Sequence, residues 1–332
     1  MNGPTFFTKI AFWILLGFLS VFFAEVLVPS SIFPFFNAFS LIFTVPLYLL
    51  HFIILASLVY RFGKPTFPVL FGAGFIFGLY EAYATKVLWV PTWEVGSWDL
   101  FFGIHWSLVL VVVGFWHAFL SFIAPLLIAD TFLVKGGGAF KKMPFFFQKT
   151  IKSPYWLFCV ILLFGVLSTS VITNPVHLLS PLSSGLVVLC SLYLWRGNFG
   201  KYEMKDLLPQ GLSFYMSLVP LLLLYVFAFF FIRAEFMPEA LTPHLTILFL
   251  YSIAGVIFWI NLKKSRVLTT VSHNEPFPWK KALITFLLFI GVGVFSFLFF
   301  PGRTVVLVLS WLPFGIISFL SIFYTLQKTF AK

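Results

Sequence analysis

Charge is what this sequence has least of. Asp, Glu, Lys and Arg make up 9% of its 332 residues, while 61% are hydrophobic and the mean hydropathy is +1.05. Soluble domains carry about 25% charged residues, and even a large soluble domain keeps much of its surface in water. The composition therefore excludes a soluble globular protein and predicts an all-α polytopic integral membrane protein.

Cysteine and catalytic signatures are scarce as well. Cys159 and Cys190 lie in separate apolar runs without metal-ligand spacing, so we predict packed thiols. The chain lacks a G-x-S-x-G elbow, a paired-aspartate motif for magnesium diphosphate and a phosphate-binding glycine loop. We predict no cofactor. The net charge of +11 does not indicate nucleic acid, because the basic residues fall in short loops between apolar runs.

Long apolar runs dominate the rest of the chain. A membrane-spanning helix needs about 20 apolar residues. By that measure the sequence predicts ten transmembrane helices, at residues 9–28, 38–60, 67–88, 105–133, 154–173, 177–196, 211–232, 242–262, 281–300 and 304–327.

The basic residues predict the orientation of these helices. With ten spans, every Lys and Arg falls on one side of the membrane except Lys86, Arg233 and Arg303. Positively charged loops stay in the cytoplasm. We therefore predict a multi-pass plasma membrane protein with cytoplasmic N- and C-termini.

Ionisable residues inside the apolar runs are confined to the first four helices. A charged group at membrane depth is costly, so it generally faces the protein interior and is often functional. The sequence thus predicts a four-helix N-terminal part (1–133) that carries the buried ionisable residues, a basic cytoplasmic loop (134–153) and a six-helix C-terminal part (154–332). The intramembrane residues are Glu25, His51, Glu81, Lys86, His117 and Asp130.

Glu81 lies on a helix face made of small residues. Gly74 and Gly78 precede it by seven and three positions, and Ala84 and Thr85 follow by three and four. Such stripes mark a close approach of another helix in membranes. We therefore predict that Glu81 points into the protein.

His117 repeats this pattern on the next helix. Its expected face carries Gly114, Ser121 and Ala124. The two helices are consecutive and antiparallel, and at ~1.5 Å rise per residue the depths of Glu81 and His117 differ by only several ångströms. We predict a buried Glu–His pair in the outer half of the membrane, with Thr85 and Ser121 beside it. The alternative is that each residue only fixes helix packing.

Glu25, His51 and Lys86 are secondary candidates for this site. Glu25 is close to a helix end, and Lys86 can extend to the outer headgroups. His51 lies at a depth similar to that of His117, which would suit a bis-histidine haem. Its bulky neighbours oppose a porphyrin, so no haem is predicted.

Three further histidines begin even-numbered helices at the outer face. His105, His177 and His244 could bind zinc together with Glu94 or Asp99. No H-x-x-x-H or H-E-x-x-H spacing supports this arrangement, so we predict no metal site.

Three functional interpretations remain open from the sequence. The first is a carrier or flippase-like permease in which the Glu–His pair moves a proton or binds a ligand. The second is an intramembrane enzyme acting on a lipid or lipid-linked substrate, with Glu81 as base and His117 as acid or metal ligand. The third is a non-catalytic subunit or assembly factor. The predicted partners are membrane lipids and, under the third interpretation, other membrane subunits.

Overall fold

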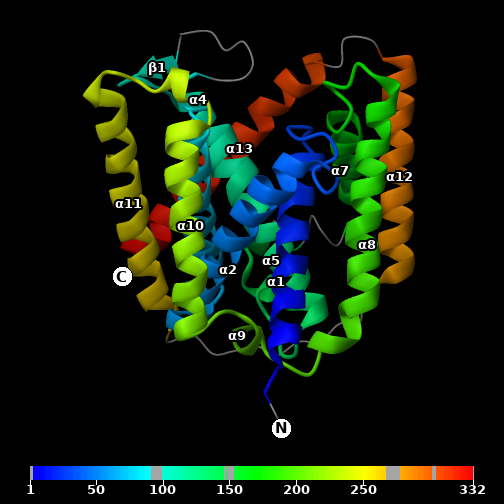
Figure 1. Cartoon of the computed structure of the whole chain (residues 1–332), viewed down its shortest axis with the longest axis horizontal. Coiled ribbons are helices and arrows are strands. Elements are labelled where there is room, and N and C mark those ends of the chain that lie inside the picture. The colour runs from blue at the N-terminus through cyan, green and yellow to red at the C-terminus, as the bar shows by residue number, and fades with distance from the viewer. Residues whose placement is uncertain are drawn as a thin grey trace. The chain divides into compact units, whose positions relative to one another are not determined.

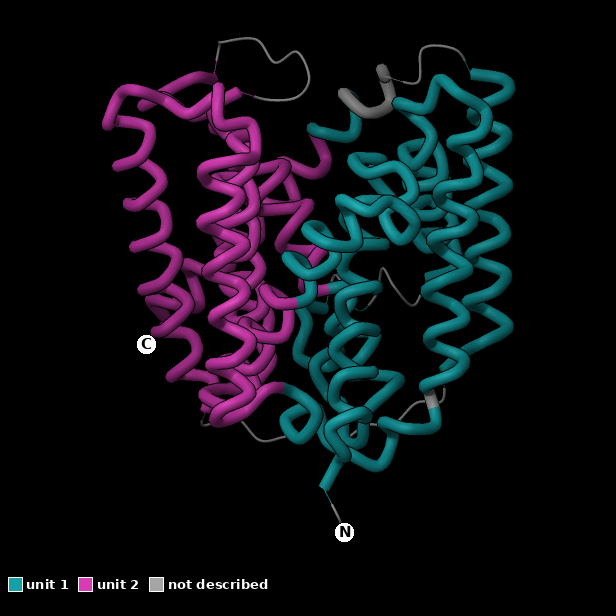
Figure 2. Tube along the Cα trace, viewed as in Figure 1, with its two compact units in different colours: residues 1–49, 124–208, 269–311 teal, residues 50–123, 209–268, 312–332 magenta. Residues whose placement is uncertain are grey.

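The helices of the protein are grouped into two compact units (Figures 1 and 2). The computed structural model describes residues 3–90, 99–145, 148, 153–266, 277–300 and 304–331. Unit 1 comprises residues 1–49, 124–208 and 269–311, and unit 2 comprises residues 50–123, 209–268 and 312–332. Each unit takes segments from both the four-helix and the six-helix part predicted from the sequence, so the units divide the chain differently.

Unit 1 is built from helices α1, α5, α7, α8, α9 and α12, with the first residues of α2 and α13. Helix α1 packs against α8, and α7 packs against α12. The indole Nε1 of Trp13 donates to the carbonyl of Leu207 at 2.7 Å, which ties α1 to α9. The elements within this unit are α1 (Phe6–Val21), η1 (Phe22–Val26), η2 (Ser40–Thr44), α5 (Ala124–Ile128), η5 (Ala129–Leu133), η6 (Phe140–Lys142), α7 (Pro154–Leu167), η7 (Pro175–Leu178), α8 (Leu179–Phe199), α9 (Met204–Leu207) and α12 (Trp279–Phe299).

Unit 2 is centred on helix α3. Thr66 precedes this helix in an extended conformation and Pro68 occupies its first turn, a favoured position because proline needs no helical hydrogen bond there. Helix α3 packs against η4, α10 and α11. The elements within this unit are α3 (Phe67–Ala84), β1 (Leu100–Phe101), β2 (Ile104–His105), α4 (Trp106–Leu108), η4 (Val109–Ile123), α10 (Leu212–Phe231), η8 (Ala234–Phe236) and α11 (Leu241–Ser265), while α2 (Val45–Phe62) and α13 (Thr304–Phe330) belong to both units.

The structure confirms the polytopic all-α class. Nine helices in its described part are long and apolar enough to cross a membrane. The remaining predicted span, 154–173, which is the fifth along the chain, corresponds to α7, which has 14 residues. At ~1.5 Å per residue, a helix of that length covers about 21 Å and falls short of a typical hydrocarbon core of about 30 Å.

Burial separates the inner helices of the units from the outer ones. In the span 67–84 and again in the span 106–133, 78% of the apolar window is buried, compared with 17% for Leu212–Phe231 and 22% for Trp279–Phe299. A helix that exposes apolar side chains all around is suited to lipid. Cys159 and Cys190 lie on α7 and α8 and are exposed, so the prediction of packed thiols is wrong. A thiol is apolar enough to face lipid.

Within the part of the chain that the structure describes, four segments are π-helical, with hydrogen bonds to the fifth residue instead of the fourth. The longest is η4 (Val109–Ile123), which carries His117, and the other three, η1, η2 and η5, have five residues each. π-Helical turns are rare and often occur at functional sites. The sequence signal for them is weak, because their apolar composition is the same as that of an α-helix.

Candidate functional site

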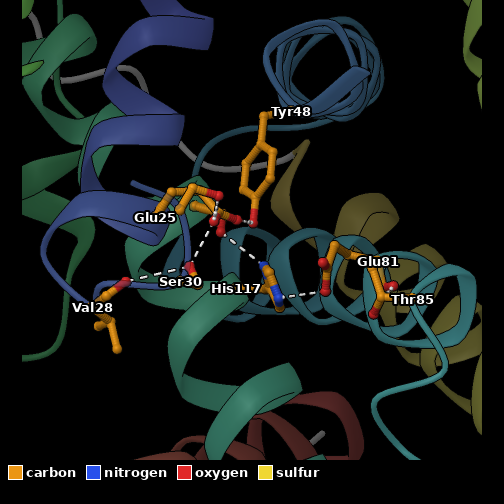
Figure 3. Close-up of polar contacts among 9 residues, drawn as sticks. Glu25, Val28, Ser30, Tyr48, Glu81, Thr85 and His117 are labelled. Carbon is orange, nitrogen blue, oxygen red and sulfur yellow. Dashed lines mark hydrogen bonds and ion pairs between the residues drawn. The ribbon is translucent and has the colours of Figure 1, made fainter. Parts of the chain in front are cut away.

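Glu81 and His117 meet inside unit 2 (Figure 3). The Nε2 atom of His117 lies 2.8 Å from Oε2 of Glu81. The His117 side chain is 4% exposed and the Glu81 side chain 13%. The structure therefore brings together the two residues that the sequence singled out, in a setting where each charge is largely removed from water.

Two glycines of α3 allow this contact. A Cβ atom on Gly74 would lie 2.7 Å from Cα and the carbonyl oxygen of Ala118, and one on Gly78 would lie 2.8 Å from the same atoms of Val113. Those distances are shorter than real carbon contacts, so α3 and η4 can approach this closely only with glycine at both positions. The small-residue stripe thus faces η4, as expected, and sets the separation of the Glu81 and His117 side chains.

His117 also contacts Ser121, through its other ring nitrogen. Nδ1 of His117 is 2.9 Å from Oγ of Ser121. The imidazole therefore links a hydroxyl on one side with a carboxylate on the other. Neutral His117 can accept from the Ser121 hydroxyl and donate to Glu81, whereas protonated His117 donates in both directions. This arrangement can move a proton along the line from Ser121 through His117 to Glu81.

Gly114 does not lie on the face that the sequence predicted, whereas Thr85 does lie beside Glu81. A Cβ on Gly114 would clash with Oγ of Ser318 on α13 at 1.9 Å, so this glycine faces α13 rather than α3. The expected face assumed α-helical spacing, whereas η4 is π-helical. Thr85 donates its hydroxyl to the backbone carbonyl of Glu81 at 3.0 Å, which caps the end of α3.

Lys86 caps the C-terminal end of α10 and does not extend to the headgroups. Its side chain is fully buried. Its ammonium donates to the carbonyls of Ala228 at 2.7 Å and Phe229 at 2.8 Å, and also to Ile232. The carbonyls of Phe229 and Ile232 lie at the end of α10, where helical N–H partners run out, and the carbonyl of Ala228 also accepts from the backbone N–H of Ile232 at 3.1 Å. The expectation that Lys86 extends to the headgroups is therefore wrong, because the end of α10 offers a better set of acceptors.

His51 lies among aromatic rings of α3. Its ring stacks on Phe77 with centroids 4.8 Å apart and meets the edge of Tyr80 at 3.7 Å. Phe77 in turn stacks on His117 at 6.0 Å. Aromatic neighbours cover the imidazole of His51, which makes it part of the packing around the Glu81 and His117 side chains.

The three outer histidines have separate partners. His177 packs against Phe33 in unit 1. In unit 2, Nδ1 of His244 is 3.2 Å from the hydroxyl of Tyr83 and its Nε2 is 3.0 Å from the carbonyl of Pro238. Within the described residues, no group of three or more His, Cys, Asp or Glu could hold a metal ion. Glu94, the other suggested ligand, lies outside those residues.

His105 forms a buried pair with Asp99, two residues that the sequence named only as possible zinc ligands. Oδ1 of Asp99 is 2.9 Å from Nδ1 of His105, and its Oδ2 accepts from the backbone N–H of Ser107 at 2.8 Å. Burial by itself raises the pKa of the Asp99 carboxyl, but hydrogen bonds from Ser107 and His105 outweigh it and hold the pKa below its ordinary value. The pair fastens the β1–β2 hairpin to α4.

The lowered pKa of Asp99 predicts a loss of stability in acid. A carboxyl whose pKa is depressed by folding stabilises the protein above its unfolded pKa of about 3.9. That contribution disappears as the pH falls through the lower folded value. Thermal unfolding in detergent from pH 6 to pH 3 measures it, and Asp99→Asn is expected to flatten the acid decline. The exposed Glu239→Gln is the control and should leave the decline unchanged. Equal slopes for wild type and Asp99→Asn would contradict the assignment.

Glu25 lies in unit 1, in the π-helical turn η1, and is 7% exposed. Its Oε2 accepts from the hydroxyls of Ser30 and Ser31, each at 2.6 Å, and its Oε1 accepts from the hydroxyl of Tyr48 (Figure 3). Sequence reasoning identified the carboxylate but missed its partners, because the inventory of intramembrane polar groups did not include hydroxyls.

Asp130, by contrast, has a structural role. Its Oδ2 accepts from the backbone N–H groups of Gly138 and Ala139, at 2.8 Å each. The carboxylate thereby fixes the turn that follows η5.

These helices and their buried polar groups define a multi-pass integral membrane protein. The chain belongs to an uncharacterized membrane protein family, which it matches over residues 14–330. A protein of Archaeoglobus fulgidus that is described as uncharacterized is 35% identical over 230 residues, which cover 68% of this chain and 70% of that protein. No solved structure matches the chain.

Proposed function

We propose that the protein is a carrier or flippase-like permease of the plasma membrane, with both termini in the cytoplasm and Glu81 and His117 as its proton-linked or ligand-binding pair. The observation that carries this proposal is the 2.8 Å contact between Glu81 and His117, buried where α3 and η4 approach most closely. A carboxylate and an imidazole in hydrogen-bond contact can pass a proton between them. A ligand that separates the two side chains would interrupt that transfer, which couples proton movement to binding.

The position of the pair along α3 supports access from the outer side. Glu81 lies one turn before the end of the helix at Ala84. The predicted orientation places that end toward the outer face, and at ~1.5 Å per residue Glu81 lies about 4.5 Å inside it. Membrane lipids surround the exposed apolar helices under this proposal.

Native mass spectrometry tests the proposal. The protein is extracted gently from its own membrane, and wild type is compared with the Glu81→Gln/His117→Ala double variant, with metal analysis alongside. We expect wild type to retain a small molecule or lipid that the double variant loses. A control variant, Glu239→Gln/His177→Ala, removes the same chemical groups elsewhere and should retain the ligand. If wild type and double variant carry the same partner subunit and no ligand, the pair serves packing and the protein is a subunit of a complex.

One contact favours an intramembrane enzyme as the second candidate. Ser121 and Glu81 contact the two ring nitrogens of His117. Serine hydrolases join a nucleophile, a base and an orienting carboxylate in the same order, with the roles of the two nitrogens exchanged. A fluorophosphonate probe distinguishes the two functions. Labelling of Ser121 that His117→Ala abolishes would favour lipid acyl transfer over transport.

A further inference from the structure

Glu25 is a buried carboxylate whose hydrogen bonds come from hydroxyl groups. Tyr48, which is 1% exposed, contacts one carboxylate oxygen, and the two serines contact the other. Among the described residues of unit 1, no Lys, Arg or His forms an ion pair with Glu25. Hydroxyl donors stabilise the ionised form, but they carry no charge to balance it. An unbalanced charge at this depth is costly.

The helix that carries Glu25 adds to the negative potential. Glu25 is the penultimate residue of the α1–η1 span, which ends at Val26. The C-terminal end of a helix is the negative end of its dipole and attracts cations. A carboxylate at that position is unfavourable unless a positive charge joins it.

The oxygen atoms around Glu25 form a set suited to a hard cation. Besides the two carboxylate oxygens they include the hydroxyls of Ser30, Ser31 and Tyr48. The Ser30 hydroxyl is also 3.3 Å from the carbonyl of Val28, just beyond the end of η1. Carboxylate, hydroxyl and carbonyl oxygens are the ligands that hard cations prefer, and in carriers the ends of broken helices supply such carbonyls to Na⁺.

From these observations we propose that Glu25, Ser30, Ser31 and Tyr48 form a binding site for Na⁺. A monovalent ion neutralises the single carboxylate, whereas a divalent ion would leave a net positive charge in the membrane. On binding, the three hydroxyls turn their hydrogens away and present lone pairs to the ion. Ser30 is exposed and gives the ion a path to the buried carboxylate.

Thermal unfolding of the purified protein tests this site. Wild type is measured in increasing NaCl, with N-methyl-D-glucamine chloride holding the ionic strength constant. A ligand that binds only the folded state stabilises it in proportion to the logarithm of its concentration above the dissociation constant. We expect a saturable rise in unfolding temperature with Na⁺ that Glu25→Gln abolishes. Ser31→Ala should raise the apparent dissociation constant about tenfold, which corresponds to about 1.4 kcal/mol.

Two control variants match these changes. The exposed Glu239→Gln removes a carboxylate elsewhere, and Ser252→Ala removes an exposed hydroxyl that bonds only its own helix. Both should keep the wild-type response. Coincident curves in the two salts for wild type, or a full response in Glu25→Gln, would overturn the proposal. If Glu25→Gln does not fold, the proposal is tested with Ser31→Ala instead, and an unchanged dissociation constant for Na⁺ in that variant would overturn it.

A proton could also balance the charge of Glu25, and the same assay separates the two cations. If acid alone stabilises the protein and Na⁺ adds nothing at any pH between 5.5 and 8, the Na⁺ site is refuted. The response is expected to persist in Glu81→Gln/His117→Ala, because those residues belong to unit 2. Failure of the Na⁺ site therefore leaves the proposed function of the Glu–His pair untouched.

Discussion

Replacing Gly78 by alanine is expected to lower the unfolding temperature, whereas the same change at Gly255 is expected to raise it. Alanine exceeds glycine in helix propensity by about 1 kcal/mol. At Gly255 a Cβ meets nothing within 4 Å, so only that gain applies. At Gly78 it would lie 2.8 Å from the Cα and carbonyl oxygen of Val113. Overpacking typically costs about 1–3 kcal/mol, and against rigid backbone we expect the upper part of that range.

The substitution of Gly78 by alanine should also disturb the contact between Glu81 and His117. The added methyl group would lie 3.0 Å from Cβ of His117, so η4 must move away from α3 and His117 moves with it. Thermal unfolding in detergent gives the sign of each change, and native mass spectrometry gives ligand retention. Two substitutions of the same sign and size would show that α3 and η4 are not held at the separation seen here.

The Glu81 and His117 contact could be predicted because three sequence signals agree. Few ionisable residues occur inside apolar runs, small residues accompany both of these, and the helices are consecutive. In a membrane, a small-residue stripe and a buried charge both indicate the protein interior. Apolar length similarly predicted the class and almost every span, because the bilayer thickness fixes the length of a helix.

The contacts of unit 1 around Glu25 could not be predicted in the same way. Tyr48 comes from a different helix, and Ser30 and Ser31 follow the end of η1, where no periodicity applies. Hydroxyl residues are common in membrane helices and usually bond their own backbone, as Ser57 does to Ile53. Only a fold shows which of them turn toward a carboxylate.

The helical face predicted from the sequence was correct for α3 but only partly correct for η4, where Ser121 contacts His117 and Gly114 faces away from α3. The stripe of Gly74 and Gly78 faces η4, since α3 has regular α-helical spacing. Gly114 faces Ser318 because η4 is π-helical over its whole length. A wider turn displaces each successive residue around the axis, and no residue type in Val109–Ile123 indicates it in advance.

Lys86→Met is expected to destabilise the protein by about 3 kcal/mol, a loss that Lys264→Met should not match. The ammonium of Lys86 satisfies the carbonyls of Ala228, Phe229 and Ile232 in a fully buried position. An unsatisfied buried acceptor costs about 1–3 kcal/mol, and the carbonyl of Ala228 keeps the N–H of Ile232 as a partner, so the loss is smaller than the sum over three acceptors. Methionine keeps the length of the side chain but provides no donor.

Lys264 is the matched control for Lys86, because its ammonium also bonds carbonyls at the end of a helix but does so at an exposed position. Its ammonium donates to the carbonyls of Thr329 and Ala331 at 2.8 Å each, at the end of α13, but the residue is exposed. Water replaces those bonds at little cost, so Lys264→Met should change stability by less than about 1 kcal/mol. Both variants are measured by thermal unfolding in one detergent.

Lys86→Gly tests how much the backbone conformation at this position contributes to stability, apart from the hydrogen bonds of the ammonium. Lys86 has a φ of 61°, a left-handed conformation that glycine adopts without strain. Lys86→Gly should lose the same hydrogen bonds as Lys86→Met, and it also empties a fully buried side-chain volume, so the relief of backbone strain offsets only part of its larger loss. Equal losses in Lys86→Met and Lys264→Met would mean that the carbonyls of α10 reach water, and the buried ammonium would then add nothing to the stability of unit 2.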